Sequence, residues 1–88
     1  MKVGDYYVMT RQLRANGTME FVARPERATS DLEQAMREAR GNAQRLRGDA
    51  RGYGVEVHEV LAVDEHGAGK EFVCVHSIDV PGRLAPPD

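Results

Sequence analysis

The segment that decides the fold is Ser30–Gly48, which reads SDLEQAMREARGNAQRLRG. Its apolar residues recur at spacings of three and four, which places them along one side of an amphipathic helix over residues 31–47. This set consists of Leu32, Met36, Ala39, Ala43 and Leu46. Ser30 and Glu33 have the spacing of a capping box at the start of a helix, and Gly48 is a suitable residue for its end. The sequence therefore predicts one helix with a single buried side.

A β-hairpin is predicted before this helix. Two stretches rich in strand-forming residues, 6–14 and 18–24, flank Ala15-Asn16-Gly17. An Asn-Gly pair often forms a two-residue turn, but that register would mix polar and apolar side chains on both faces. A three-residue loop pairs Arg14 with Thr18 and separates the two kinds of side chain better. We therefore predict the three-residue loop, with Gly17 in the left-handed conformation.

A second hairpin is predicted after the helix, with strands over residues 55–63 and 71–80. The stretch between them, residues 64–69, is rich in turn-forming residues. We predict a register that pairs Val63 with Phe72, because it places most apolar residues of both strands on one face. In this register Glu59 lies opposite His76.

The sequence predicts an α+β fold of the order ββαββ, in which a four-stranded, mainly antiparallel sheet has one amphipathic helix packed on one face. The first and last strands are apolar on both sides, which favours inner positions and the spatial order 2-1-4-3. We expect a single domain over residues 1–80. Residues 81–88 are rich in proline and are expected to form a flexible tail.

Charge and composition exclude several classes of protein. The 88 residues include 12 basic and 14 acidic ones, and this balance argues against a strongly basic nucleic-acid binder and against an acidic tail. A single cysteine, Cys74, excludes an internal disulfide and a zinc site with several cysteines. Because no apolar run could span a membrane and the first residues lack the apolar centre of a signal peptide, we expect a cytoplasmic protein without membrane contact.

One face of the predicted sheet suggests an interface. A helix of about 17 residues covers only one face of such a sheet, so apolar residues on the other face favour association with another molecule. Homodimerisation through sheet faces or an edge strand is the simplest use of them, and separate surface valines are the alternative. The candidate interface residues are Tyr6, Val8, Val22, Val60, Val73 and Val75.

A row of basic residues lies beside the buried side of the predicted helix: Arg37, Arg40, Arg47 and Arg51. Such a row could contact phosphate groups or an acidic partner. However, Glu33 is spaced to pair with Arg37, and a solvated side of the helix is the favoured interpretation. Binding of nucleic acid is therefore possible but not favoured.

A third candidate group consists of Glu59, His76 and Cys74. A carboxylate that orients a histidine beside a thiol meets the minimum requirement for nucleophilic cysteine chemistry. A satisfied polar pair with a small core cysteine is the favoured interpretation. Because His58 and His76 are expected on opposite faces, no metal site is predicted. We thus predict no catalytic, cofactor-binding or metal-binding residue, and the chain is not expected to be an enzyme.

In size and layout the chain resembles the small single-domain proteins with which phages and mobile elements block host defence complexes, including anti-CRISPR proteins. The resemblance covers the overall format and transfers no site residue. It implies a large nucleoprotein partner.

We therefore expect a non-enzymatic protein–protein interaction module that needs no cofactor, forms a homodimer, and binds or inhibits a larger complex. Two alternatives remain open. One is a nucleic-acid-associated module that uses the arginine row. The other is a small dimeric enzyme or ligand-binding domain in which Glu59 and His76 line a shared cavity.

Overall fold

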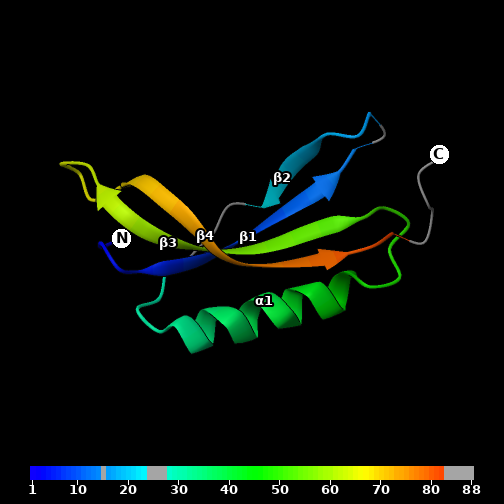
Figure 1. The fold of residues 1–88 in the computed structure, drawn as a ribbon, viewed down its shortest axis with the longest axis horizontal. Coiled ribbons are helices and arrows are strands. Elements are labelled where there is room, and N and C mark those ends of the chain that lie inside the picture. The colour runs from blue at the N-terminus through cyan, green and yellow to red at the C-terminus, as the bar shows by residue number, and fades with distance from the viewer. Residues whose placement is uncertain (15, 24–27, 83–88) are drawn as a thin grey trace.

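The computed structural model describes residues 1–14, 16–23 and 28–82. The elements occur in the order β1 (Tyr6–Leu13), β2 (Met19–Ala23), α1 (Leu32–Leu46), β3 (Tyr53–Val63) and β4 (Gly69–Val80). Figure 1 shows α1 lying along one face of the four-stranded sheet, so the predicted α+β fold is confirmed. The predicted flexible tail lies, from residue 83 onward, outside the described residues.

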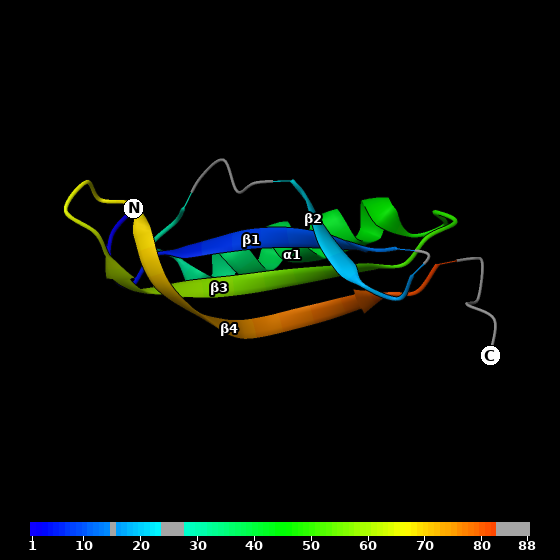
Figure 2. The same ribbon diagram turned by 90° about the horizontal axis from the view of Figure 1, so that it is seen from above.

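The spatial order of the strands is β2-β1-β3-β4, and all neighbouring strands are antiparallel. Figure 2 shows β3 between β1 and β4. The predicted order 2-1-4-3 is therefore wrong. Apolar residues on both sides of a strand indicate an inner position only when both sides are covered, and β4 lies at the edge with Val73 and Val75 still 41% and 43% exposed. The inner strand β3 instead holds Val55 and Val57, which have no exposed surface.

The first hairpin has the predicted three-residue loop. The amide of Arg14 donates a hydrogen bond of 2.8 Å to the carbonyl oxygen of Thr18. The side chain of Asn16 accepts a hydrogen bond of 3.0 Å from the Thr18 amide, and Gly17 has a φ of +85°. Beyond the loop Leu13 pairs with Met19, as the prediction requires. An irregularity between Thr10 and Arg11 shifts the register further along β1.

The helix begins one residue later than the capping box suggests. Asp31, not Ser30, is the N-cap residue, and its side chain accepts a hydrogen bond of 3.0 Å from the Glu33 amide. At the other end, Gly48 has a φ of +87°, as a residue that terminates a helix often does. No helix among residues 1–14, 16–23 and 28–82 is both long and apolar enough to cross a membrane.

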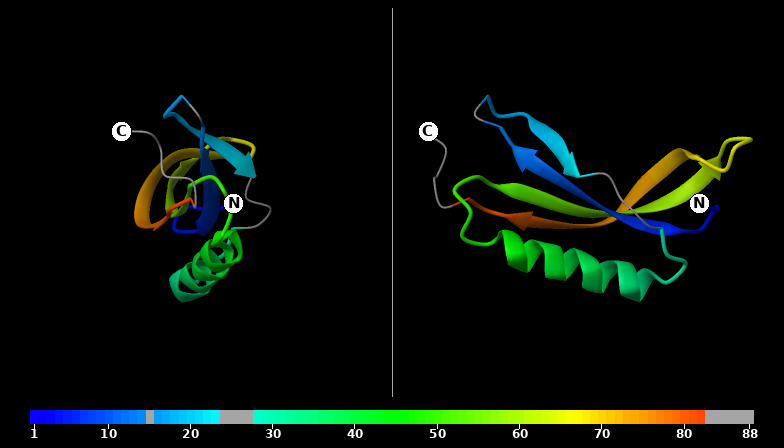
Figure 3. Two further views of the ribbon diagram at one scale, coloured as in Figure 1. Left: turned by 90° about the vertical axis from the view of Figure 1, so that its right-hand side faces the viewer. Right: turned by 180° about the vertical axis from the view of Figure 1, so that it is seen from behind.

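The core lies between α1 and the sheet and consists of small side chains. The buried residues of the helix are all alanines, which allow its backbone to approach the strands closely. The prediction included two of them but missed Ala35, and its Leu32 is 37% exposed. Figure 3 shows the helix on one side of the sheet, with no helix of the described chain on the other. The core residues are Val8, Ala35, Ala39, Ala43, Val55, Val57 and Val80.

The side chains of β1 face opposite to the prediction. Val8 lies in the core beneath the helix, and Tyr6 packs against that core. Tyr7 is also buried, but on the other face, where its ring stacks on that of His58. The thin layer between the helical alanines and the sheet suits valine, whereas the larger Tyr7 ring finds aromatic partners on the face without a helix.

The register between β3 and β4 also differs from the prediction. Val57 lies opposite His76, but the next residue of β3, His58, lies opposite Cys74. Val75 is therefore an extra residue in β4, which is a β-bulge. A shift of one residue moves a side chain to the other face of the sheet. The bulge therefore places Cys74 on the face of His58, opposite to the face that His76 shares with Val57. The predicted register would place Val55 opposite Val80, but Val55 lies opposite Ile78, so the pairing is already offset by two residues before the bulge shifts it by one more.

Two glycines of the helical region are expected to respond oppositely to replacement by alanine. Gly41 is exposed in α1, and an added Cβ would have no heavy atom within 4 Å. Gly41→Ala should therefore raise the free energy of unfolding by about 1 kcal/mol through helix propensity. Gly48→Ala is the matched control and should lower it by about 1–2 kcal/mol, because alanine disfavours the positive φ. Urea denaturation measures both, and a loss of stability in Gly41→Ala would contradict the assigned environment.

The loop after the helix is tied to the sheet by Tyr53. Its hydroxyl donates a hydrogen bond of 3.0 Å to the Asp49 carboxylate and accepts one of 3.2 Å from the Gln12 side chain. The hydrogen bond to Asp49, together with some burial and the charge of Asp49, raises the pKa of Tyr53 above its ordinary value. The neutral phenol is therefore favoured in the folded protein.

The neutral phenol of Tyr53 should contribute its full stabilisation at pH values below the unfolded pKa of about 10. This contribution should be lost as pH rises through the higher pKa of the folded state. Tyr53→Phe should lower the free energy of unfolding at neutral pH by about 0.5–1 kcal/mol and should weaken its decline at alkaline pH. Chemical denaturation at several pH values tests this. An alkaline decline identical to that of the unchanged protein would show that the Tyr53–Asp49 contact contributes nothing.

Candidate functional site

A group of three polar residues lies at the centre of the face without a helix. Glu56 and His58 belong to β3, and because they are two residues apart their side chains share this face. Cys74 belongs to β4 and is the pairing partner of His58. One possible ligand atom of each residue lies within 4.8 Å of the others. We call Glu56, His58 and Cys74 the polar triad.

The two β3 members of the polar triad are in direct contact and partly buried. Oε1 of Glu56 lies 2.8 Å from Nε2 of His58, and their side chains are 19% and 12% exposed. The other carboxylate oxygen, Oε2, lies 3.5 Å from Nε of Arg11 on β1. This buried nitrogen has no hydrogen-bond partner among the described residues. Arg11 therefore acts on Glu56 through its charge rather than through a directed hydrogen bond.

Aromatic rings hold His58 in place. The ring of Tyr7 is stacked on that of His58, with centroids 5.5 Å apart and an angle of 17° between the planes. Phe72 meets Tyr7 edge-on at 5.2 Å and 85°. Tyr7 is only 4% exposed, and this burial raises the pKa of its hydroxyl. The stack restricts the rotation of the imidazole, so the position of Nε2 toward Glu56 is fixed by packing.

Cys74 supplies the exposed member of the polar triad. Its thiol donates a hydrogen bond of 3.4 Å to the carbonyl oxygen of His76, within its own strand. The triad therefore combines a thiol at the surface with a carboxylate and an imidazole beneath it. These groups can bind a cation, and they are also the residue types from which cysteine nucleophiles are built.

The triad replaces the group predicted from the sequence and shares only Cys74 with it. Glu59 lies opposite Val73 and His76 opposite Val57, so the structure does not bring Glu59 and His76 together as cross-strand partners. Sequence reasoning missed Glu56 and His58. Their spacing of two was a usable signal for a shared face, but the bulge that brings Cys74 to that face left no signal.

The predicted interface residues are dispersed. Tyr6 and Val8 pack on the helix side of the sheet, and Val60 has no exposed surface. The prediction that Val8 and Val60 belong to an exposed patch is therefore wrong. Val73 and Val75 are exposed on β4, and the side chain of Val22 lies outside the described part of the chain. Exposed apolar side chains that the prediction missed include Met19, Phe21, Leu61 and Phe72.

The four arginines of the predicted row are all exposed. Arg37 and Arg40 lie on α1, Arg47 is its C-cap, and Arg51 lies beyond it. Among the described residues none of them forms an ion pair. The row thus extends past the helix into the following loop.

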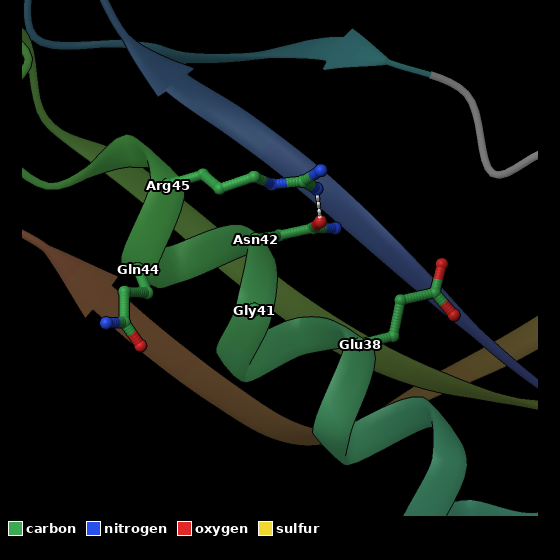
Figure 4. Close-up of a pocket in the computed structure, with 5 residues that line it drawn as sticks. All are labelled: Glu38, Gly41, Asn42, Gln44 and Arg45. Carbon is green, nitrogen blue, oxygen red and sulfur yellow. Dashed lines mark hydrogen bonds between the residues drawn. The ribbon is translucent and has the colours of Figure 1, made fainter.

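The exposed side of α1 also has a shallow hollow at Gly41, where a side chain is absent. Figure 4 shows the surrounding side chains, with Arg45 donating a hydrogen bond to Asn42. The hollow is lined by Glu38, Gly41, Asn42, Gln44 and Arg45. These residues spread along an open surface, so the hollow is a weaker candidate than the polar triad.

The fold and the site together define a small α+β protein with a partly buried polar triad on the face of its sheet that no helix covers. No family model matches this chain, and no curated protein or solved structure shows significant similarity to it. Its function is therefore inferred from its own residues.

Proposed function

We propose that this chain is a non-enzymatic protein–protein interaction module that forms a homodimer along β4 and, as a dimer, binds and inhibits a larger complex. The observation that carries the proposal is the character of β4. It is an edge strand of 12 residues, and its accessible apolar side chains follow one another along the chain. These are Phe72, Val73 and Val75, which are 42%, 41% and 43% exposed.

The two edges of the sheet differ greatly in length. β2 has 5 residues, whereas β4 has 12 and extends over at most about 40 Å. The outer side of an edge strand presents unpaired amide and carbonyl groups, and a long apolar edge readily pairs with another strand. β4 is therefore the edge that favours strand addition.

A second copy of the chain is the simplest partner for this edge. Antiparallel pairing of two identical strands about a two-fold axis matches the same surface on both copies, so the assembly closes as a dimer. The paired sheets would have eight strands with both helices on the same face. Val73 and Val75, members of the interface predicted from sequence, lie within this contact.

Three further observations support the larger part of the proposal. The format resembles that of anti-CRISPR proteins, which act on nucleoprotein complexes. The chain is small and its net charge is only −2, so recognition through shape and apolar contact is favoured over strong electrostatic attraction. The exposed thiol of Cys74 suits the reducing cytoplasm, which is the compartment we propose.

Sedimentation equilibrium tests the dimer directly. The chain should sediment at twice its mass of 9.8 kDa, and Val75→Glu should shift it to the monomer, because two charges would be buried near each other at the contact. Leu32→Glu is the matched control on the helix, where a 37% exposed residue is changed in the same way, and it should remain dimeric. A monomer at every concentration of the unchanged chain would exclude the homodimer.

Purified RNA-guided nuclease complexes of several types provide the test for inhibition. The dimer should block target cleavage by one of them at near-stoichiometric amounts, and Val75→Glu should do so much less effectively. Failure to bind or inhibit any complex, combined with salt-sensitive binding of DNA or RNA that Arg37→Gln/Arg40→Gln weakens, would favour the nucleic-acid alternative instead. Fluorescence anisotropy at low and high salt measures that binding.

A further inference from the structure

The polar triad offers one sulfur, one nitrogen and one oxygen ligand on the same face of the sheet. Zinc prefers thiolate, imidazole and carboxylate ligands of this kind. From the usual zinc–ligand bond lengths, the atoms around a tetrahedral ion lie about 3.3–3.8 Å apart. The triad already has Glu56 and His58 in contact at 2.8 Å, and all its ligand atoms lie within 4.8 Å of one another. An adjustment of about 1 Å would therefore complete the geometry.

Tyr7 and Arg11 contact members of the triad and would orient them toward such an ion. Stacking on Tyr7 fixes the ring plane of His58, and residues that orient ligands in this way strengthen metal binding. Arg11 lies beside Oε2 of Glu56, so Oε1, the oxygen that faces His58, remains the one directed into the triad. The carboxylate and a thiolate together balance the charge of a divalent ion, and the neighbouring guanidinium of Arg11 leaves the group with one net positive charge.

The bulge at Val75 gives the triad its third ligand. Without that extra residue, regular alternation would place Cys74 on the same face as His76, beneath the helix. β-bulges are known to redirect a side chain at a site of function. This bulge, one of three register shifts between β3 and β4, is therefore what places Cys74 beside His58.

We propose that Glu56, His58 and Cys74 bind one Zn²⁺ ion, with a fourth position open to solvent. The ion lies between Oε1 of Glu56 and Nε2 of His58, the neutral imidazole carries its one proton on Nδ1, and the Cys74 thiol releases its proton to solvent on binding. An exposed position beside Cys74 leaves room for a water molecule as the fourth ligand. The site does not depend on the proposed dimer, because all three ligands come from one chain.

Titration calorimetry with Zn²⁺ and absorption spectroscopy with Co²⁺ test the site on the 88-residue chain without an affinity tag. One ion should bind per chain, and Co²⁺ should show the charge-transfer absorption of a cobalt–thiolate bond. Cys74→Ser should remove this absorption and weaken Zn²⁺ binding by more than about tenfold. His58→Gln should weaken binding similarly, while circular dichroism confirms that both variants fold.

His76→Gln is the matched control, since His76 lies next to the same strand segment but opposite Val57, on the other face. It should bind Zn²⁺ as the unchanged chain does, and so should Leu32→Glu, which adds a carboxylate on α1, away from β3 and β4. Absence of the cobalt–thiolate absorption, or equal affinity in the unchanged chain and Cys74→Ser, would overturn the zinc site. Neither result would affect the dimer, which sedimentation measures separately.

Discussion

The contact between three helical alanines and the valines of the sheet is the constraint on which the structure depends. Ala35, Ala39 and Ala43 lie on one side of α1 and are buried. Their small size lets the helix approach the strands closely, and the layer beneath it is wide enough only for side chains such as Val55 and Val57. Among the described residues the buried core holds no aromatic ring, and the rings of Tyr6 and Tyr53 that pack against it are only partly buried. Tyr7, Phe21 and Phe72 accordingly lie outside the helix-side core.

Coverage of only one face explains why the polar triad can exist. A carboxylate and an imidazole would be costly under the helix, where no water or partner could compensate them. On the other face they pair with each other, Arg11 lies beside the carboxylate, and the imidazole and carboxylate remain 12% and 19% exposed. Tyr7 covers one side of the His58 ring, and Phe72 packs against Tyr7. The same lack of a second layer therefore leaves apolar residues at the surface and provides the intermediate environment in which a metal can be bound.

Local signals in the sequence predicted the elements well, and long-range ones less well. The helix was predicted to within about a residue at each end, because capping residues and the spacing of apolar residues are properties of neighbouring residues. The first hairpin was also predicted correctly near its loop, where Asn16 and Gly17 determine the turn. The sequence did not predict correctly which side chains of β1 face the helix. Tyr6 and Val8 on one side of the strand are as apolar as Tyr7 and Met9 on the other. The choice between them depends on the thinness of the core.

Only part of the candidate site could be predicted from the sequence, because the bulge at Val75 could not be predicted. The shared face of Glu56 and His58 follows from strand periodicity. The residue of β4 that lies opposite His58, however, depends on whether β4 contains an extra, unpaired residue. One extra residue moves Cys74 to the face of Glu56 and His58, whereas a two-residue offset of the strands before the bulge separates Glu59 from His76. Val75 is also one of the most exposed apolar residues of β4. A bulge weakens regular pairing at an edge strand. The bulge at Val75 therefore favours the placement of Cys74 in the triad but disfavours the addition of a second strand. The balance of these two effects determines how much of β4 can pair with a second copy of the chain.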